Sequence, residues 1–154
     1  MRSEILLEQA RAASYLIYNL RADATRALKL YQELKALAAA LPDRSEIHKW
    51  QAAAAFNLIN PLAENPAMVP QALALYQELK ALAAMLPHEA EIHKWQAGAA
   101  HKLIYYLGVD PTEQLLVLEL YKDLKTLAAA HPAKSEIQKW LAEAVAKLTQ
   151  PRDN

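Results

Sequence analysis

The sequence of 154 residues has no cysteine, only two glycines and only one phenylalanine. Without cysteine the chain can form neither a disulfide nor a thiolate ligand for a metal ion. The two glycines, Gly98 and Gly108, cannot form a glycine-rich phosphate-binding loop. β-Branched residues are also few, whereas the strong helix formers Ala, Leu, Glu, Lys and Gln are abundant. The composition therefore predicts an all-α protein.

The chain also lacks an excess of charge and a long apolar run. Lys and Arg together number 17, as do Asp and Glu, so the formal net charge is zero. Binding to nucleic acid or to an anionic membrane would need a basic footprint, and no basic cluster is present. No apolar run reaches the roughly 20 residues of a membrane span, and Glu4, Glu8 and Arg11 interrupt any signal-like start. We therefore expect no nucleic-acid partner, no membrane partner and a cytoplasmic location.

What the sequence does contain is an internal repeat with a period of 45 residues. Three segments of 33 residues, beginning at Ala27, Ala72 and Val117, align without gaps, and the first two agree at 25 positions. A weaker half-copy precedes them, because the residues from Ser3 align with those from Ser45. The sequence therefore predicts one repeat domain over 1–154, with a half-repeat at 3–20 and repeats at about 24–60, 66–107 and 111–149.

Each copy divides into two amphipathic helices. Apolar residues recur at i, i+3, i+4 and i+7 in the first segment, and a proline such as Pro42 then ends it. Ser, Asp or Asn residues at the segment starts are typical N-caps, and five fit this role: Asp23, Ser45, Asn65, Asp110 and Ser135. The pattern predicts seven helices, at about 3–20, 24–41, 45–60, 66–86, 90–107, 111–131 and 135–149.

The repeat resembles the tetratricopeptide repeat family. Trp50 lies at the fourth position of the second helix and the small residue Ala54 follows four residues later, while Ala27 precedes Tyr31 by four in the first helix. The resemblance implies a right-handed α-solenoid of antiparallel helical hairpins, whose Trp-bearing helices line the concave face. The period of 45 residues is longer than the 34 of that family, and a stack of HEAT-like hairpins is the alternative.

No pattern of catalytic or metal-binding residues accompanies the repeat. The serines at helix starts are explained by capping, and none lies in a nucleophile elbow. His48 and His93 occupy equivalent positions about 8–10 Å apart, too far for two ligands of one metal ion, and Gln138 replaces them in the third copy. We therefore expect no enzyme activity, no cofactor and no metal site.

The remaining candidate is a binding groove on the Trp-bearing helices. We expect Trp50, Trp95 and Trp140 to be largely buried, which leaves a nearly neutral face of small, His and Gln residues exposed. That face supplies the predicted partner-binding groove: Gln9, His48, Gln51, Ala55, His93, Gln96, Ala100, Gln138, Leu141 and Val145. The expected function is a protein- or peptide-binding scaffold module, and the alternative is a structural spacer or oligomerisation segment.

The first helix lacks the partner helix that precedes every other Trp-type helix. Ile5, Leu7 and Leu16 should therefore be partly uncovered. Terminal repeats without a polar outer face are prone to association. We expect either a fragment of a longer repeat protein or a homodimer through the N-terminal half-repeat.

Overall fold

A computed structural model describes residues 2–150, and within that range the chain contains α-helices and no strand, as the composition predicts. No helix in this range combines the length and the hydropathy that a membrane span requires. The α-helices are α1 (Arg2–Asn19), α2 (Ala24–Ala40), α3 (Ser45–Glu64), α4 (Val69–Met85), α5 (Ala90–Leu107), α6 (Gln114–Ala130) and α7 (Ser135–Thr149). The short 3-10 helices η1 (Pro66–Met68) and η2 (Pro111–Glu113) precede α4 and α6.

The helix boundaries agree with the prediction except around three prolines. The third helix was expected to end near residue 60, but α3 continues through Pro61 to Glu64. Proline has no N–H, so the carbonyl of Asn57 lacks its i+4 donor inside this helix. Pro66 and Pro111 lie in the 3-10 turns, so the α-helices there begin a few residues later than predicted.

The helix caps are confirmed in three of five places, where a side chain accepts a hydrogen bond from a backbone N–H: Asp23, Asn65 and Asp110. The prediction was wrong for Ser45 and Ser135, which are already the first helical residues. Arg44 and Lys134 are the N-caps there, and neither forms a side-chain capping bond. After Pro42 and Pro132, the next helix therefore begins one residue earlier than the capping pattern predicts.

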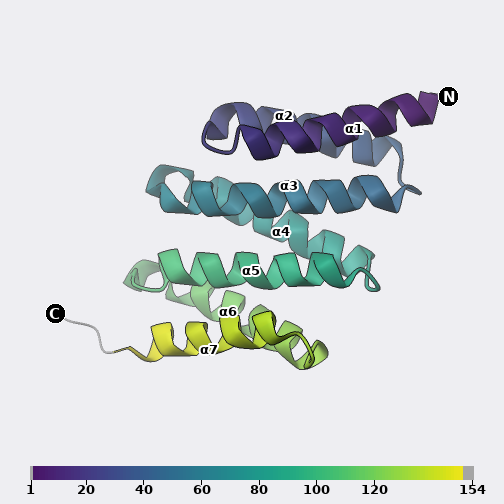
Figure 1. Ribbon diagram of the computed structural model, residues 1–154. Coiled ribbons are helices and arrows are strands. Elements are labelled where there is room, and N and C mark those ends of the chain that lie inside the picture. Colours follow the sequence, from purple (N-terminus) through teal and green to yellow (C-terminus); the bar gives the residue numbers. More distant parts are fainter. Residues whose placement is uncertain (1, 151–154) are drawn as a thin grey trace.

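The helices form two layers (Figure 1). The front layer consists of α1, α3, α5 and α7, which lie side by side, and each packs directly on the next. The back layer consists of α2, α4 and α6, and each of these packs against the front-layer helix before it and the one after it. Within the described chain the back-layer helices make no comparable contact with one another. The hydrophobic core therefore lies between the layers.

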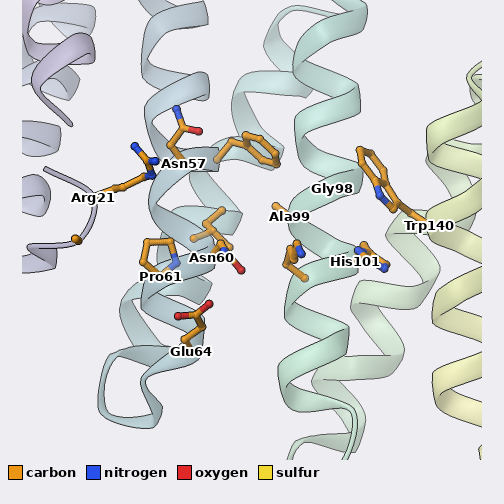
Figure 2. Close-up of a pocket in the computed structure, with 13 residues that line it drawn as sticks. Arg21, Asn57, Asn60, Pro61, Glu64, Gly98, Ala99, His101 and Trp140 are labelled. Atoms are coloured by element: carbon orange, nitrogen blue, oxygen red, sulfur yellow. The ribbon is translucent and has the colours of Figure 1, made fainter. Parts of the chain in front are cut away.

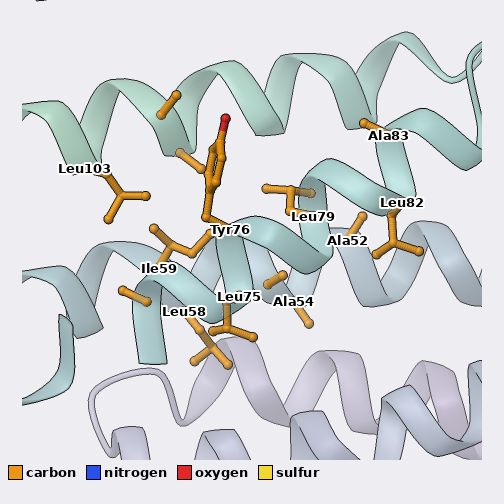
Figure 3. Packing of buried hydrophobic residues seen from close by; sticks show 14 of the residues in the cluster. Ala52, Ala54, Leu58, Ile59, Leu75, Tyr76, Leu79, Leu82, Ala83 and Leu103 are labelled. Carbon is orange, nitrogen blue, oxygen red and sulfur yellow. The ribbon is translucent and has the colours of Figure 1, made fainter. Parts of the chain in front are cut away.

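Small residues allow the front-layer helices to approach closely. Ala52 and Ala55 of α3 and Ala97 and Ala100 of α5 are completely buried. Large side chains from the back layer fill the remaining space, as the buried ring of Tyr76 does among leucine and isoleucine side chains of α3, α4 and α5 (Figure 3). This arrangement resembles interior packing in other proteins, where few voids remain.

A hydrogen-bonded cluster, here called the polar seam, lies inside this core. The Tyr31 hydroxyl accepts a hydrogen bond from the Gln51 amide at 3.1 Å and lies 3.2 Å from a carboxylate oxygen of Glu78. Lys35 forms an ion pair with the same carboxylate at 2.9 Å. The seam therefore joins α2 to α3 within one repeat and to α4 of the next.

The next repeat forms a second seam with the same chemistry. The Tyr76 hydroxyl accepts from Gln96 at 3.3 Å and donates to Asp123 at 2.9 Å, and Lys80 pairs with Asp123 at 3.0 Å. Burial is the main reason why the pKa of each seam tyrosine is raised above its usual value. Because buried polar groups need partners, both hydroxyls remain neutral and hydrogen-bonded. In the third copy, Leu141 occupies the glutamine position.

Candidate functional site

Half of the ten residues predicted to line the groove are buried instead of lying on an open face. Gln51 and Gln96 are each only 6% exposed, and Ala55 and Ala100 are completely buried, so their expected exposure is wrong. The two glutamine amides can be buried because each donates a hydrogen bond to a tyrosine hydroxyl of a polar seam.

The polar residues three positions before Gln51, Gln96 and Leu141 form hydrogen bonds with the hairpin turns or the helix ends beside them. The ring nitrogen Nε2 of His48 lies 3.2 Å from the carbonyl of Pro42, and Nε2 of His93 lies 3.1 Å from that of Pro87. Gln138 donates to the carbonyl of Ala128 at 2.8 Å. His48 is buried, whereas His93 and Gln138 are partly exposed. These contacts give the three side chains a structural role that the sequence pattern did not predict.

The remaining predicted groove residues occupy separate places. Gln9 is exposed on α1, Val145 is exposed on α7, and Leu141 is partly buried against the core. The structure therefore does not bring the ten predicted residues together on one open face.

The three tryptophans pack against the core and keep only a minor part of their surface exposed, in line with the prediction, although they are less enclosed than core residues such as Tyr76. The Trp95 ring stacks on Phe56 of the preceding repeat, with centroids 6.4 Å apart and planes 21° apart. The Trp140 ring stacks on His101 in the same way, at 6.1 Å and 24°. Trp95 and Trp140 therefore each bridge two neighbouring front-layer helices.

Three hollows run across the outer face of the front layer, and together we call them the front furrow. The first, of about 280 Å³, lies between α1 and α3 and includes Tyr15, Trp50 and Asn57. The second, of about 470 Å³, lies between α3 and α5 and extends to Trp140 (Figure 2). The third, of about 620 Å³, lies between α5 and α7. Asn57 borders the first two hollows and His101 the last two, so the three hollows are neighbours in a row across four helices.

Gly98 forms part of the floor of the second hollow. A Cβ atom at this position would lie 3.0 Å from the Phe56 ring and 3.2 Å from the Trp140 ring. The absence of a side chain therefore lets these two aromatic rings approach α5 from both sides. The result is a shallow surface with an apolar floor and aromatic walls, features that ligand-binding surfaces share.

Polar groups at one rim of the furrow are held in place. The Tyr106 hydroxyl donates to Glu64 at 2.9 Å and lies 3.3 Å from the Asn60 side-chain oxygen. Burial and then the Glu64 carboxylate raise the pKa of Tyr106 to about 12, so the hydroxyl stays protonated. Nearby, Pro61 leaves the backbone carbonyl of Asn57 without an intrahelical donor. The rim therefore offers the side-chain amides of Asn57 and Asn60 as donors.

His101 lies at the centre of the furrow. Its Nε2 is 2.7 Å from a carboxylate oxygen of Glu143, and its Nδ1 is buried without a partner. Burial lowers the pKa of His101, while Glu143 acts in the opposite direction. Burial also lowers the pKa of His131, which lies beside the His93 ring and Lys134.

These depressed pKa values predict a loss of stability in acid. Because the folded state disfavours the charged form of His101 and His131, stability is full above the unfolded-state pKa of about 6.5 and falls as the pH decreases. We expect the free energy of unfolding to be lower at about pH 5.5 than at about pH 7.5, and this difference to shrink in His101→Gln. Urea unfolding at the two pH values measures it, and an equal difference in parent and variant would contradict the assignment.

The sequence pattern missed the furrow, although the repeat contains a signal for it. Core positions keep the same residue in the first two copies, as Gln51 and Gln96 do. The furrow position Asn57 becomes Lys102 and then Lys147. Positions that vary between copies of a repeat are those that packing leaves free, so this variation marks the open face.

Comparison with known proteins adds no further assignment. No protein-family model, no curated protein and no solved structure matches the chain. Among residues 2–150, no three His, Cys, Asp or Glu side chains gather closely enough to hold a metal ion.

Proposed function

We propose that the chain is a right-handed α-solenoid of antiparallel helical hairpins that serves as a protein- or peptide-binding scaffold and not as an enzyme. The observation that carries this proposal is the front furrow, a row of three neighbouring hollows across four helices. Pockets for small molecules are usually compact and enclosed, whereas an elongated open furrow suits a peptide. A cytoplasmic location is part of the proposal.

The contacts between layers support a concave front face. Front-layer helices pack directly on one another, while back-layer helices lie further apart and meet through long side chains such as Lys35 and Glu78. In a curved stack the inner helices lie closer together than the outer ones, which supports the front layer as the inner one. The same layer carries the tryptophans that the resemblance to tetratricopeptide repeats places on the concave face. Concave surfaces of this kind are the ones that repeat proteins use for binding.

The furrow's chemistry suits a peptide with apolar and acidic side chains. Its aromatic walls and its floor at Gly98 accept apolar side chains, and the asparagine amides can pair with a peptide backbone. Four cationic side chains but only two carboxylates border the hollows. The cations are Arg11, Arg21, Lys102 and Lys147, and the carboxylates are Glu64 and Glu143. Electrostatic complementarity would therefore favour an acidic partner.

Selection from a phage-displayed random peptide library tests the proposal. We expect selected peptides to be enriched in acidic and apolar residues, and Lys102→Glu to weaken their binding about tenfold by reversing a charge in the furrow. Lys122→Glu is the matched control, because Lys122 is an exposed lysine of the back-layer helix α6. Isothermal titration calorimetry measures both affinities.

Two outcomes would contradict the proposal. If the control variant weakened binding as much as Lys102→Glu, the furrow would not be the binding surface. If no peptide were enriched, the alternative of a structural spacer or oligomerisation segment would be favoured.

A further inference from the structure

A second apolar groove, separate from the front furrow, lies at the α1 end of the stack. It has a volume of about 590 Å³ and lies between α1 and α2. Apolar side chains form most of it, and one amide and one carboxylate lie among them: Gln9, Ala13, Leu16, Leu30, Glu33 and Leu37. Leu16 is 48% exposed and the nearby Ile5 is 61% exposed, as the missing partner helix predicts.

The internal repeat shows what covers the equivalent groove one repeat later. Gln9 and Leu16 of α1 correspond to Gln51 and Leu58 of α3, and Glu33 of α2 corresponds to Glu78 of α4. Leu58 is completely buried and Gln51 nearly so. Helix α2 covers them, since its Tyr31 hydroxyl contacts both Gln51 and Glu78.

A helix fills the groove between α5 and α6 in the same way. There Gln96 and Asp123 take the two polar positions, and α4 supplies Tyr76 and Lys80. Two of the three grooves of this type are therefore filled by a back-layer helix with a tyrosine and, four residues later, a lysine. The groove at α1 has the same polar positions and no helix over it among residues 2–150.

We propose that the α1/α2 groove binds one further helix of the back-layer kind, supplied by a partner. This helix carries an apolar face with an alanine, a tyrosine four residues later and a lysine four residues after that, as Ala27, Tyr31 and Lys35 do in α2. Its tyrosine hydroxyl lies between the Gln9 amide and the Glu33 carboxylate, and its lysine pairs with Glu33. The proposal concerns a different surface from the front furrow and does not depend on the proposed function.

A second copy of the chain fits this groove less well. Each back-layer helix already packs between two front-layer helices of its own copy, so none is free to enter the groove of another. Two α1/α2 grooves placed face to face would offer a carboxylate and an amide from each copy, but no tyrosine hydroxyl between them. The expected homodimer is therefore an outcome that the experiment must distinguish.

A synthetic peptide with the sequence of residues 24–41 is the probe. We expect it to bind the full chain with one-to-one stoichiometry in fluorescence titrations, and Leu16→Glu to weaken binding at least about tenfold by placing a charge in the apolar groove. Leu118→Glu is the matched control, because Leu118 of α6 is also 48% exposed and lies outside the groove. Circular dichroism establishes that both variants remain folded.

The tyrosine contact is tested by a double-mutant cycle. Replacing the tyrosine of the peptide by phenylalanine should weaken binding to the parent chain about fivefold, since it removes the hydroxyl between two polar partners. The same replacement should have no effect on binding to a chain with Gln9→Ala and Glu33→Ala. A penalty that persists in this variant would overturn the proposal.

Three further results would overturn it. The first is the absence of peptide binding at millimolar concentration. The second is equal weakening by Leu16→Glu and Leu118→Glu. The third is a dimer of the parent chain, seen by sedimentation without peptide, that Leu16→Glu dissociates, since a second copy would then occupy the groove.

Discussion

Tyr76→Ala is expected to lower the free energy of unfolding by about 4–5 kcal/mol, near the upper end for a buried aromatic residue. The ring is completely buried between the layers, so its removal leaves a cavity lined by leucine and isoleucine side chains (Figure 3). The substitution also removes the hydroxyl that satisfies Gln96 and Asp123, and the stranded amide adds a desolvation cost. Urea unfolding followed by circular dichroism measures the change.

Tyr121→Ala is the matched control for this prediction. Tyr121 occupies the same repeat position but is only half-buried, and Leu141 stands where the other copies have glutamine. We therefore expect a clearly smaller loss for Tyr121→Ala. Equal losses for the two variants would mean that the polar seam contributes nothing beyond packing.

Gln51→Glu is expected to destabilise the protein by about 2–4 kcal/mol near neutral pH, because it places a carboxylate in a buried site. Gln51 is 6% exposed and donates to Tyr31, whose hydroxyl already contacts the Glu78 carboxylate. The new side chain has no donor of its own when ionised and adds negative charge beside Glu78.

The pH dependence and a control at the surface distinguish the cost of burying a charge from the effect of adding a carboxylate anywhere on the chain. Burial raises the pKa of an introduced glutamate, so the destabilisation is present above its unfolded-state pKa of about 4.3 and is relieved as the pH falls toward that value. Gln32→Glu, on the exposed side of α2, should change stability by less than about 0.5 kcal/mol. If Gln51→Glu behaved like Gln32→Glu, Gln51 would be exposed, as the sequence pattern predicts.

The sequence predicted the helices because local chemistry determines them. The repeated apolar stripe and the prolines Pro42, Pro87 and Pro132 set the helix positions within a few residues. The failure at Pro61 has a cause outside the local sequence. A proline disfavours the helix interior, but Leu62 and Ala63 after Pro61 are buried in the core, which favours continuation of the helix.

The sequence could not predict how far burial extends around the front-layer helices. In α3, alanines extend from Ala52 to Ala55, so apolar residues surround much of the helix and the periodic pattern does not select one face. A large tryptophan normally indicates the core, and a glutamine normally indicates the surface. Here close packing needs the alanines, and a tyrosine from another helix satisfies the glutamine, so Gln51 is buried while Trp50 is only partly buried. The contact between Gln51 and Tyr31 depends on how two helices pack, which the pattern within one helix does not show.

Chemical-shift mapping with a library-selected peptide tests most directly the claim that the front furrow is the binding surface. The account predicts that the backbone amide signals with the largest changes belong to residues on the furrow of α3 and α5, namely Asn57, Gly98, His101 and Lys102. The exposed back-layer positions Gln32 and Gln77 should be unaffected. Changes centred on those back-layer positions, with none at Asn57 or Lys102, would contradict the account.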